Sequence, residues 1–237
     1  MSVPTLDCDL GNTRVKWRFG DSQGEGPFED RTCFHLLGVS RVRLASVVSP
    51  ELTAAWERRC QAAWPGVIIE TPVVEALPNG LTPIYKKPET MGIDRWLGLA
   101  AIWEPGHSIC VISCGTATTI DFVDASGQHV GGYIAPGIHL ARQALGTHTA
   151  KVRSSSTSLF DARLSPGRDT QTCVEHALRL SQVGLIKEAV YRFESQHGDA
   201  GLLHLTGGNA GWLAGLVDRP TKVHRNLVLD GLKRVLP

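Results

Sequence analysis

Asp9-Leu10-Gly11-Asn12-Thr13, followed by Lys16, stands at the end of an apolar segment that begins at Leu6. A glycine lets backbone N–H groups approach phosphate oxygens, and amide and hydroxyl side chains donate hydrogen bonds to the same oxygens. The lysine adds a positive charge, and the carboxylate can hold magnesium. The stretch therefore predicts a strand-end turn that binds the phosphates of a nucleotide. The alternative is a plain β-turn in which Asp9 and Asn12 bond their own backbone.

A shorter copy of this stretch, Ser113-Cys114-Gly115-Thr116-Ala117, follows at an offset of 104 residues. Each copy comes after an apolar strand and precedes a hydroxyl residue and a second strand. We therefore expect an α/β fold of two related lobes, residues 1–106 and 107–237, with a cleft between them. In the second copy a serine occupies the position of the carboxylate.

Apolar periodicity and turn residues predict the remaining elements. Gly127 and then Gly131-Gly132 mark a hairpin, and residues 76–90 and 147–170 are expected to be loops, the second of them mobile. The expected strands are 6–10, 15–19, 43–48, 67–69, 107–113, 118–123 and 202–205, and the expected helices are 53–64, 93–103, 138–146, 172–194 and 228–235.

The composition is that of an ordinary globular domain, with 42% hydrophobic and 20% charged residues. A formal net charge of +1 gives no reason to expect nucleic acid or an anionic membrane as a partner. We expect no signal peptide, because the N-terminus lacks a basic segment followed by a long apolar core. We expect no membrane-spanning helix, because no run approaches about 18 apolar residues. The six cysteines lack CxxC spacing and the nine histidines are scattered, which favours reduced, mostly buried thiols in a cytoplasmic protein over a zinc site.

Gly92-Ile93-Asp94-Arg95 opens a predicted helix after a loop that contains Tyr85. Asp94 is either the N-cap of this helix or a general base that accepts a hydroxyl proton in phosphoryl transfer. Arg95 is either a solvated neighbour or the partner of a substrate carboxylate in a two-pronged contact.

Two further glycine-rich segments have both a structural and a functional interpretation. Gly131-Gly132-Tyr133-Ile134-Ala135-Pro136-Gly137 has the composition of a tight hairpin turn, and by itself that interpretation is favoured. Thr206-Gly207-Gly208-Asn209-Ala210 joins a strand to a helix. Its small residues leave room for a nucleoside, and a helix N-terminus favours anions. An ordinary strand-to-helix turn explains the same residues.

Taken together and in order, these motifs resemble those of the type III pantothenate kinase family, also called the Bvg accessory factor family. Asp9 to Thr13 with Lys16 resembles its first phosphate motif, and Gly92 to Arg95 resembles its GxDR motif, with Tyr85 seven residues before it. The other matching segments are Cys114 to Ala117 with Thr119 and Asp121, Gly131 to Gly137, Gly167-Arg168-Asp169-Thr170, and Thr206 to Ala210.

The resemblance implies an actin-like (ribonuclease H-like) fold and the ATP-dependent phosphorylation of pantothenate, the first step of coenzyme A biosynthesis. It implies a homodimer, Asp94 as the base, and Asp9 as the ligand of magnesium. The implied ATP-binding residues are Asp9, Leu10, Gly11, Asn12, Thr13, Arg14, Val15, Lys16, Thr116, Gly207 and Gly208. The implied pantothenate-binding residues are Tyr85, Gly92, Ile93, Asp94, Arg95 and Thr170, with Thr172 as the weaker candidate for the threonine.

Ser113 departs from the family pattern, which has an aspartate that holds a monovalent cation, potassium or ammonium. A serine offers a neutral oxygen. We therefore expect weaker binding of the cation, or a cation held by backbone carbonyls and phosphate oxygens. Complete loss of activity is the other outcome consistent with this change.

Two other functions compete with the kinase. A nucleotide-binding regulator without catalysis agrees with Ser113, but Asp94, Arg95, Tyr85 and Lys16 would then have little purpose. A phosphatase of the same superfamily is disfavoured by the GxDR motif and its tyrosine.

Overall fold

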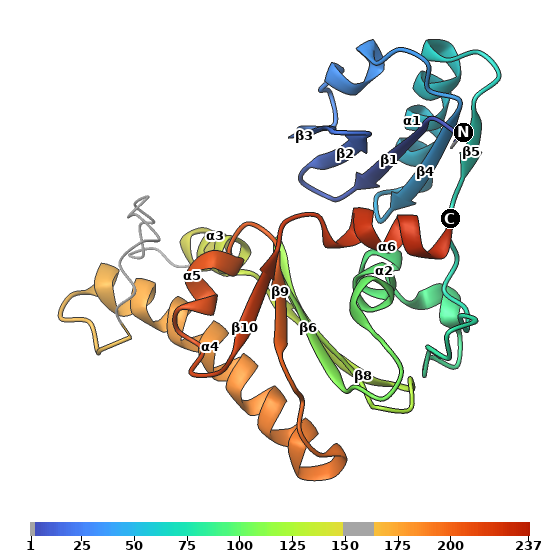
Figure 1. Cartoon of the computed structure of the whole chain (residues 1–237). Helices are drawn as coiled ribbons and strands as arrows, with labels where there is room; N and C mark the ends of the chain where they lie inside the picture. The colour runs from blue at the N-terminus through green and yellow to red at the C-terminus, as the bar shows by residue number, and fades with distance from the viewer. Residues whose placement is uncertain (1–2, 149–163) are drawn as a thin grey trace. The chain divides into compact units, whose positions relative to one another are not determined.

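A computed structural model describes residues 3–148 and 164–237 of the chain (Figure 1). The chain forms two compact units, one of residues Met1–Trp103 with Asn226–Pro237 and one of residues Glu104–Arg225. The boundary at residue 103 lies close to the predicted one. The closing helix differs from the expectation, because it packs with the first unit and not with the second.

The sheet of the first unit has the strand order β3-β2-β1-β4-β5. The three strands at one side form antiparallel pairs, whereas β1, β4 and β5 run parallel. Its strands are β1 (Thr5–Leu10), β2 (Val15–Phe19), β3 (Ser22–Gly26), β4 (Arg41–Ser46) and β5 (Ile68–Glu70).

Alternation along β1 divides its side chains between the two faces of this sheet. Leu6, Cys8 and Leu10 are buried in a core with Trp56 and Cys60 of α1 (Pro50–Ala63), next to the short helix η1 (Thr32–His35). Asp7 and Asp9 point to the opposite face. On that face α2 (Ile93–Ile102) and α6 (Leu227–Val235) pack against each other and against Ala45 of β4.

The start of α1 shows why the predicted boundary was three residues late. Ser49 caps the helix, since its side chain accepts a hydrogen bond from the Leu52 N–H, and Pro50 occupies the first helical position. Proline is well suited to that position because it lacks the N–H that would have no partner there.

The sheet of the second unit has the order β10-β9-β6-β7-β8, which repeats the topology of the first. The β6–β7 and β7–β8 pairs are antiparallel, and the β6–β9 and β9–β10 pairs are parallel. The offset of 104 residues predicted from sequence relates β1 to β6 at both ends. The strands are β6 (Ile109–Cys114), β7 (Ala117–Val123), β8 (His129–Pro136), β9 (Leu203–Thr206) and β10 (Thr221–His224).

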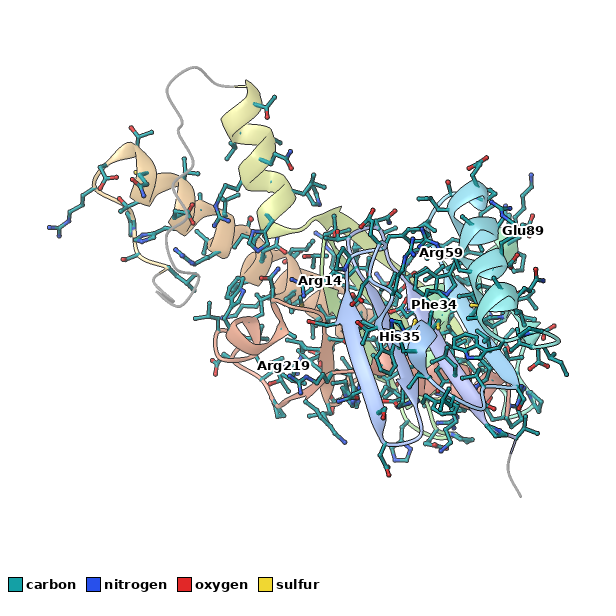
Figure 2. All side chains as sticks on the ribbon, turned by 90° about the horizontal axis from the view of Figure 1, so that it is seen from above. Arg14, Phe34, His35, Arg59, Glu89 and Arg219 are labelled. Atoms are coloured by element: carbon teal, nitrogen blue, oxygen red, sulfur yellow. The ribbon has the colours of Figure 1, made fainter. Side chains whose placement is uncertain are left out.

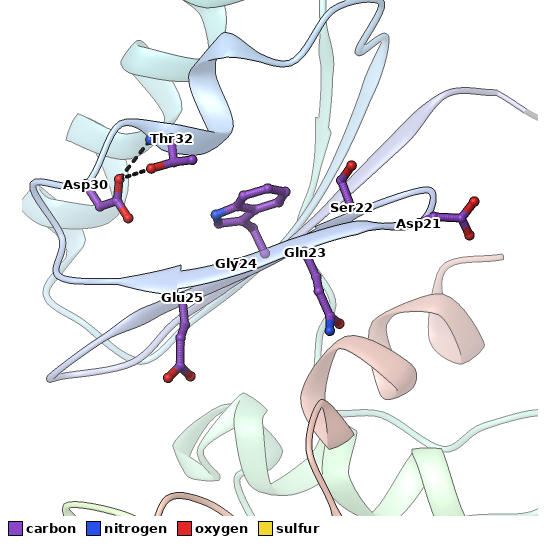
Figure 3. A pocket seen from close by; sticks show the side chains of 8 residues that line it. Asp21, Ser22, Gln23, Gly24, Glu25, Asp30 and Thr32 are labelled. Carbon is purple, nitrogen blue, oxygen red and sulfur yellow. Dashed lines mark hydrogen bonds between the residues drawn. The ribbon is translucent and has the colours of Figure 1, made fainter.

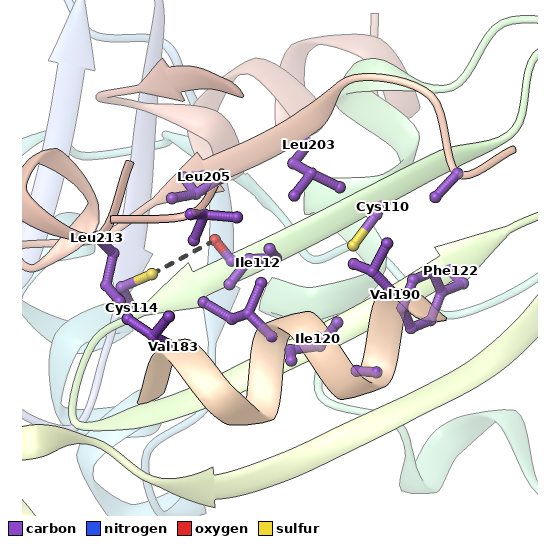
Figure 4. Packing of buried hydrophobic residues seen from close by; sticks show 14 of the residues in the cluster. Cys110, Ile112, Cys114, Ile120, Phe122, Val183, Val190, Leu203, Leu205 and Leu213 are labelled. Carbon is purple, nitrogen blue, oxygen red and sulfur yellow. Dashed lines mark hydrogen bonds between the residues drawn. The ribbon is translucent and has the colours of Figure 1, made fainter. Parts of the chain in front are cut away.

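The core of the second unit lies between one face of this sheet and the helices α4 (Thr170–His197) and α5 (Ala210–Ala214). Figure 4 shows Ile112, Cys114 and Ile120 of the sheet beside Val183 of α4. Ser113 alternates with Ile112 and Cys114 and therefore lies on the opposite face of the sheet. This placement matches that of Asp9 in the first unit.

The segment 147–170 was predicted to be a mobile loop, but helices occupy both of its ends. Helix α3 (Ile138–His148) extends into it, and α4 begins at Thr170. Asp169 caps α4 in a reciprocal arrangement, in which its carboxylate accepts from the Thr172 N–H while the Thr172 hydroxyl accepts from the Asp169 N–H. Residues 149–163 lie outside the described part of the chain.

The prediction that Gly131-Gly132 marks a hairpin turn was wrong. The turn lies at Asp124–Gln128, where Gly127 was correctly placed, and both glycines belong to β8. A Cβ atom on Gly132 would lie 2.1 Å from the backbone oxygen of Ile120, so glycine here permits close approach to β7. Strands β3 and β10 were also missed, because SQGEG and TKVH lack an apolar pattern.

The tryptophans of α1 and α2 and of their C-terminal caps are buried: Trp56, Trp64, Trp96 and Trp103. Phe34 of η1, labelled in Figure 2, contacts the rings of Trp56 and Trp64. Five of the cysteines are buried and Cys173 is exposed. Within the described residues, no cluster of three or more metal-ligating side chains is found, and no helix is long and apolar enough to cross a membrane.

Candidate active site

The first predicted phosphate turn joins β1 to β2. The Gly11 N–H donates to the Arg14 carbonyl at 3.0 Å, so closure of the turn needs neither the Asp9 nor the Asn12 side chain. Asp9 lies opposite Lys16 in the antiparallel register, which places both side chains on the same face of the sheet. Arg14, labelled in Figure 2, forms an exposed ion pair with Glu25 of β3 at 2.9 Å.

Asp9 and Asp94 are two carboxylates of the first unit whose charges repel each other. Asp9 is the last but one residue of β1 and lies on the face that α2 covers, and Asp94 lies in the first turn of α2. Burial, and then the charge of Asp94, raise the pKa of Asp9 to about 7, against the opposing effect of Lys16. A carboxylate with such a pKa is typical of functional sites, where burial and like charges meet.

Asp94 is not the N-cap of α2. That position belongs to Gly92, and the Asp94 carboxylate accepts a hydrogen bond from the Arg95 N–H at 2.8 Å. A Cβ on Gly92 would lie 2.7 Å from Oδ1 of Asp94. The glycine of this motif therefore leaves room for the carboxylate, which a larger residue would displace.

Arg95 and Tyr85 hold each other in place. Nη1 of Arg95 donates to the Tyr85 hydroxyl oxygen at 3.0 Å, and the guanidinium lies over the Tyr85 ring at 5.8 Å from its centroid. Arg95 is buried, so it is not the solvated neighbour that the sequence left open. Tyr85 thus contacts Arg95 in the first turn of α2, next to Asp94 in the chain, and the role of these residues in a substrate site stays a prediction.

The second predicted phosphate turn joins β6 to β7 and is closed by a hydrogen bond of 3.1 Å from the Gly115 N–H to the Ala117 carbonyl. Ser113, the counterpart of Asp9, lies in register with Thr119 on β7 and with Thr206 on β9. Three hydroxyl residues on adjacent strands therefore share one face at the end of β6. No motif in the sequence predicts this arrangement, because its three residues lie on three separate strands.

The other glycine-rich motifs of the second unit meet this turn. The Gly137 N–H donates to the Thr116 carbonyl at 2.9 Å, and the Asn209 N–H donates to the Cys114 carbonyl at 3.1 Å. A Cβ on Gly137 would lie 2.3 Å from the Gly115 oxygen. Gly207 has a φ of +92°, and a Cβ there would lie 2.7 Å from the Cys114 backbone. Glycine is therefore required at both positions for the backbone to approach so closely.

Thr170 and Thr172 differ in their local roles. Thr172 is committed to the cap of α4, where its hydroxyl accepts from the Arg168 N–H at 3.0 Å and pairs with Asp169. Thr170 is exposed at the first position of the helix. The difference favours Thr170, the residue preferred from sequence, as the threonine available to a substrate.

A pocket of about 470 Å³ lies along β3 and contains none of the predicted site residues (Figure 3). Trp17 lines it beside Gly24, and Asp30 bonds Thr32 at its rim. Asp21, Glu25 and Asp30 are among its lining residues, but the Glu25 side chain points to the other side of β3 and pairs with Arg14.

Comparison with known proteins identifies the family. A sequence model of type III pantothenate kinase matches residues 28–192. The chain belongs to the type III pantothenate kinase family. A family member from Cellvibrio japonicus is 35% identical, with 89% of this chain and 88% of the relative covered. Another from Marinobacter nauticus is 34% identical, with 97% of each chain covered.

Solved structures support the fold. A protein described as a Baf family transcriptional activator, from Campylobacter jejuni, superposes with a TM-score of 0.68 at 21% identity, over 98% of this chain and 96% of its own. An acetate kinase from Entamoeba histolytica superposes with a TM-score of 0.50 at 8% identity, over 98% and 99%. Family membership and the repeated sheet topology confirm the predicted α/β, actin-like class of two lobes.

The structure also brings to the pantothenate kinase motifs residues that sequence reasoning missed. Gln182 of α4 bonds both Thr118 and the carbonyl of Pro136, next to the second phosphate turn. A glutamine in the middle of a long helix carries no sequence signal for such a contact, since only the fold brings residues 118, 136 and 182 together.

Proposed function

We propose that this chain transfers the γ-phosphoryl group of ATP to the hydroxyl of pantothenate, in the cytoplasm, as the first step of coenzyme A biosynthesis. Membership of the type III pantothenate kinase family gives the reaction. The observation that supports the residue assignments best is the group formed by Tyr85, Asp94 and Arg95, because a protein that only binds nucleotide has no use for it.

Asp94 is the proposed general base. Its carboxylate is held by the Arg95 N–H and has the space that Gly92 provides. It would accept the proton of the pantothenate hydroxyl as that oxygen attacks the γ-phosphorus, a role suited to a positioned carboxylate.

Arg95 and Tyr85 are the proposed contacts of the pantothenate carboxylate. A guanidinium binds a carboxylate through two parallel hydrogen bonds, and the Tyr85 contact restricts Arg95 to one orientation. Ile93 contributes to the packing that fixes α2 beneath these groups. Thr170 is the proposed third contact, from the start of α4.

The first turn is the proposed site for phosphate and magnesium. The proposed donors are backbone N–H groups between Leu10 and Val15, together with the side chains of Asn12, Thr13, Arg14 and Lys16. The donor set fits a divalent cation, because burial and the charge of Asp94 raise the pKa of Asp9, and a bound cation would stabilise the ionised carboxylate against both. Magnesium bound by Asp9 would supply charge neutralisation of the phosphate oxygens.

The second turn is the proposed site for further phosphate and nucleoside contacts. Thr116 is exposed at its tip, and Gly208 has open space where a side chain would stand. Gly207 brings the β9–α5 turn against the backbone of Cys114, two residues before Thr116.

A monovalent cation at Ser113 would be held by neutral oxygens. The hydroxyls of Ser113, Thr119 and Thr206 can supply ligands, but none carries the charge that an aspartate would. We therefore propose weak potassium or ammonium binding.

The family resemblance implies a homodimer. Leu180 and Tyr191 support this proposal, because they are 53% and 67% exposed and, eleven residues apart, share one face of α4. Multi-angle light scattering should give a mass near twice the 25.6 kDa of one chain. The mass of a single chain would contradict it.

An assay of ADP release with and without pantothenate tests the function, with the product identified by its mass. Release that depends on pantothenate, with a product heavier by one phosphoryl group, is expected. ATP binding without turnover would instead support the non-catalytic regulator that Ser113 left open.

A further inference from the structure

The side chains that helix α4 buries are largely polar toward its N-terminus and apolar toward its C-terminus. Its N-terminal half buries Glu175, Arg179 and Gln182, at 5%, 2% and 4% exposure, whereas its C-terminal half buries apolar residues from Val183 onwards. The spacing of the three polar residues places them on one face of the helix. Burial of polar groups is unfavourable unless they are bonded, so this polar face needs specific partners.

Glu175 finds its partner in α3. Its two carboxylate oxygens accept from Nε and Nη2 of Arg142 at 2.8 and 2.7 Å. This two-pronged contact fixes α4 against the helix that follows directly after Gly137.

Gln182 finds its partners in the sheet. Its side-chain oxygen accepts from the Thr118 hydroxyl at 2.5 Å, and its side-chain nitrogen donates to the Pro136 carbonyl at 3.1 Å. Thr118 lies near the start of β7 and Pro136 ends β8, where the two strands are paired. One buried side chain therefore ties both strands to α4. Val183, the next residue, packs in the core beside Cys114 (Figure 4).

Both tied strands lead directly to the second phosphate turn. Pro136 precedes Gly137, whose N–H donates to the Thr116 carbonyl at 2.9 Å, and Thr118 follows Thr116 by two residues. Gly137 also approaches the Gly115 and Thr116 carbonyls too closely for any side chain. The position of Thr116 is thus set from both sides by atoms that Gln182 holds.

We propose that Gln182 is a positioning residue for nucleotide binding. It holds the 115–117 turn in the geometry that the phosphates require, without touching the nucleotide itself. The inference rests on the proposed role of Thr116 as a phosphate contact.

The test is calorimetric titration of the full-length protein with magnesium and AMP-PNP, a non-hydrolysable ATP analogue. Gln182→Met keeps the side-chain length and removes both hydrogen bonds, and should raise the Kd about tenfold. The KM for pantothenate should stay within about twofold. Gln196→Met, at an exposed position of the same helix, is the matched control and should leave the Kd unchanged.

A second pair of variants separates positioning from a general loss of stability. Thr118→Val removes the hydroxyl that Gln182 accepts from and should weaken AMP-PNP binding, whereas Thr118→Ser keeps it and should bind as the wild type does. If Gln182→Met does not fold, the two Thr118 variants still test whether the Gln182 contact positions the 115–117 turn. Equal affinity of Thr118→Val and Thr118→Ser would overturn the proposal, as would an unchanged Kd in folded Gln182→Met. A wild-type protein that binds no AMP-PNP would refute the proposed nucleotide site itself.

Discussion

The two sheets share strand order and strand direction, yet the ends of their first strands carry different chemistry. At the end of β1, Asp9 lies opposite Lys16 and interacts with Asp94. At the corresponding end of β6, Ser113 lies between Thr119 and Thr206, and closely approaching glycine backbones surround the turn. The same topology therefore supports a charged site in one unit and a neutral backbone site in the other. The difference suggests that the first unit supplies the charges of catalysis and the second mainly supplies binding geometry.

The largest effect on activity is expected for Asp94→Asn, which removes a charged carboxylate from the first unit. An amide cannot accept the hydroxyl proton, so kcat should fall by about 100- to 10,000-fold. The Kd for AMP-PNP with magnesium should change little. Steady-state kinetics and calorimetry measure the two quantities. Asp218→Asn, at an exposed position, is the control, and unchanged turnover in Asp94→Asn would refute the assigned base.

Arg95→Lys tests the substrate contact of the first unit. A lysine keeps the charge but loses the planar pair of donors, so the KM for pantothenate should rise by roughly tenfold or more. The KM for ATP should be unaffected. Arg192→Lys changes a 63%-exposed side chain in the same way and serves as the matched control. A parallel rise of both KM values would argue against a specific contact with pantothenate.

Ser113→Asp tests the difference between the two turns by placing a carboxylate at the β6 position that corresponds to Asp9. The new charge should lower the potassium concentration for half-maximal activity by about tenfold, since charge-assisted contacts are worth roughly twice neutral ones. Activity is measured against KCl at constant ionic strength, with Ser195→Asp as an exposed control. Half-saturation of the wild type at low-millimolar potassium would show that the hydroxyls already form an intact site.

The smallest expected effect concerns stability. The pKa of Asp9 is raised from 3.8 to about 7, so the protonated form is favoured in the folded state. Its contribution to stability is full below about pH 4 and is lost as the pH rises through 7. Asp9→Asn removes this dependence and should raise the free energy of unfolding at pH 8, relative to pH 4, by on the order of 1 kcal/mol. Urea unfolding at both pH values measures it, and equal dependence in both proteins would contradict the raised pKa.

Much of this fold was predictable because the two units repeat a local pattern. The apolar strands β1 and β6 and their glycine turns are visible in the sequence, and so is the offset between them. The strands β3 and β10 were not predicted, because polar edge strands form through pairing with a neighbour and need no apolar face. The place of α6 was missed for a similar reason. Its apolar residues Leu229 and Leu232 show that it packs, but not that its partners are Leu97 and Ala45.

The site was predictable where a motif is continuous in sequence. Asp94 and Arg95 were assigned from one tetrapeptide, and the structure adds the contact of Arg95 with Tyr85. The raised pKa of Asp9 was not predictable, since it depends on burial and on a residue 85 positions away. The contact of Gln182 with Thr118 and Pro136 could likewise not be predicted from the sequence, because it joins three elements that are distant in the chain.

The most direct test of the division between the two units is the magnesium dependence of pantothenate phosphorylation in Asp9→Ser and Ser113→Asp. Asp9→Ser gives the first turn the residue of the second, and Ser113→Asp makes the reverse change. We expect Asp9→Ser to lose about 100-fold or more in turnover at any magnesium concentration, because the only carboxylate assigned to the metal is gone. Ser113→Asp should keep the magnesium dependence of the wild type. Equal losses of turnover in both variants, or full turnover in Asp9→Ser, would contradict the assignment of magnesium to the first turn and not to the second.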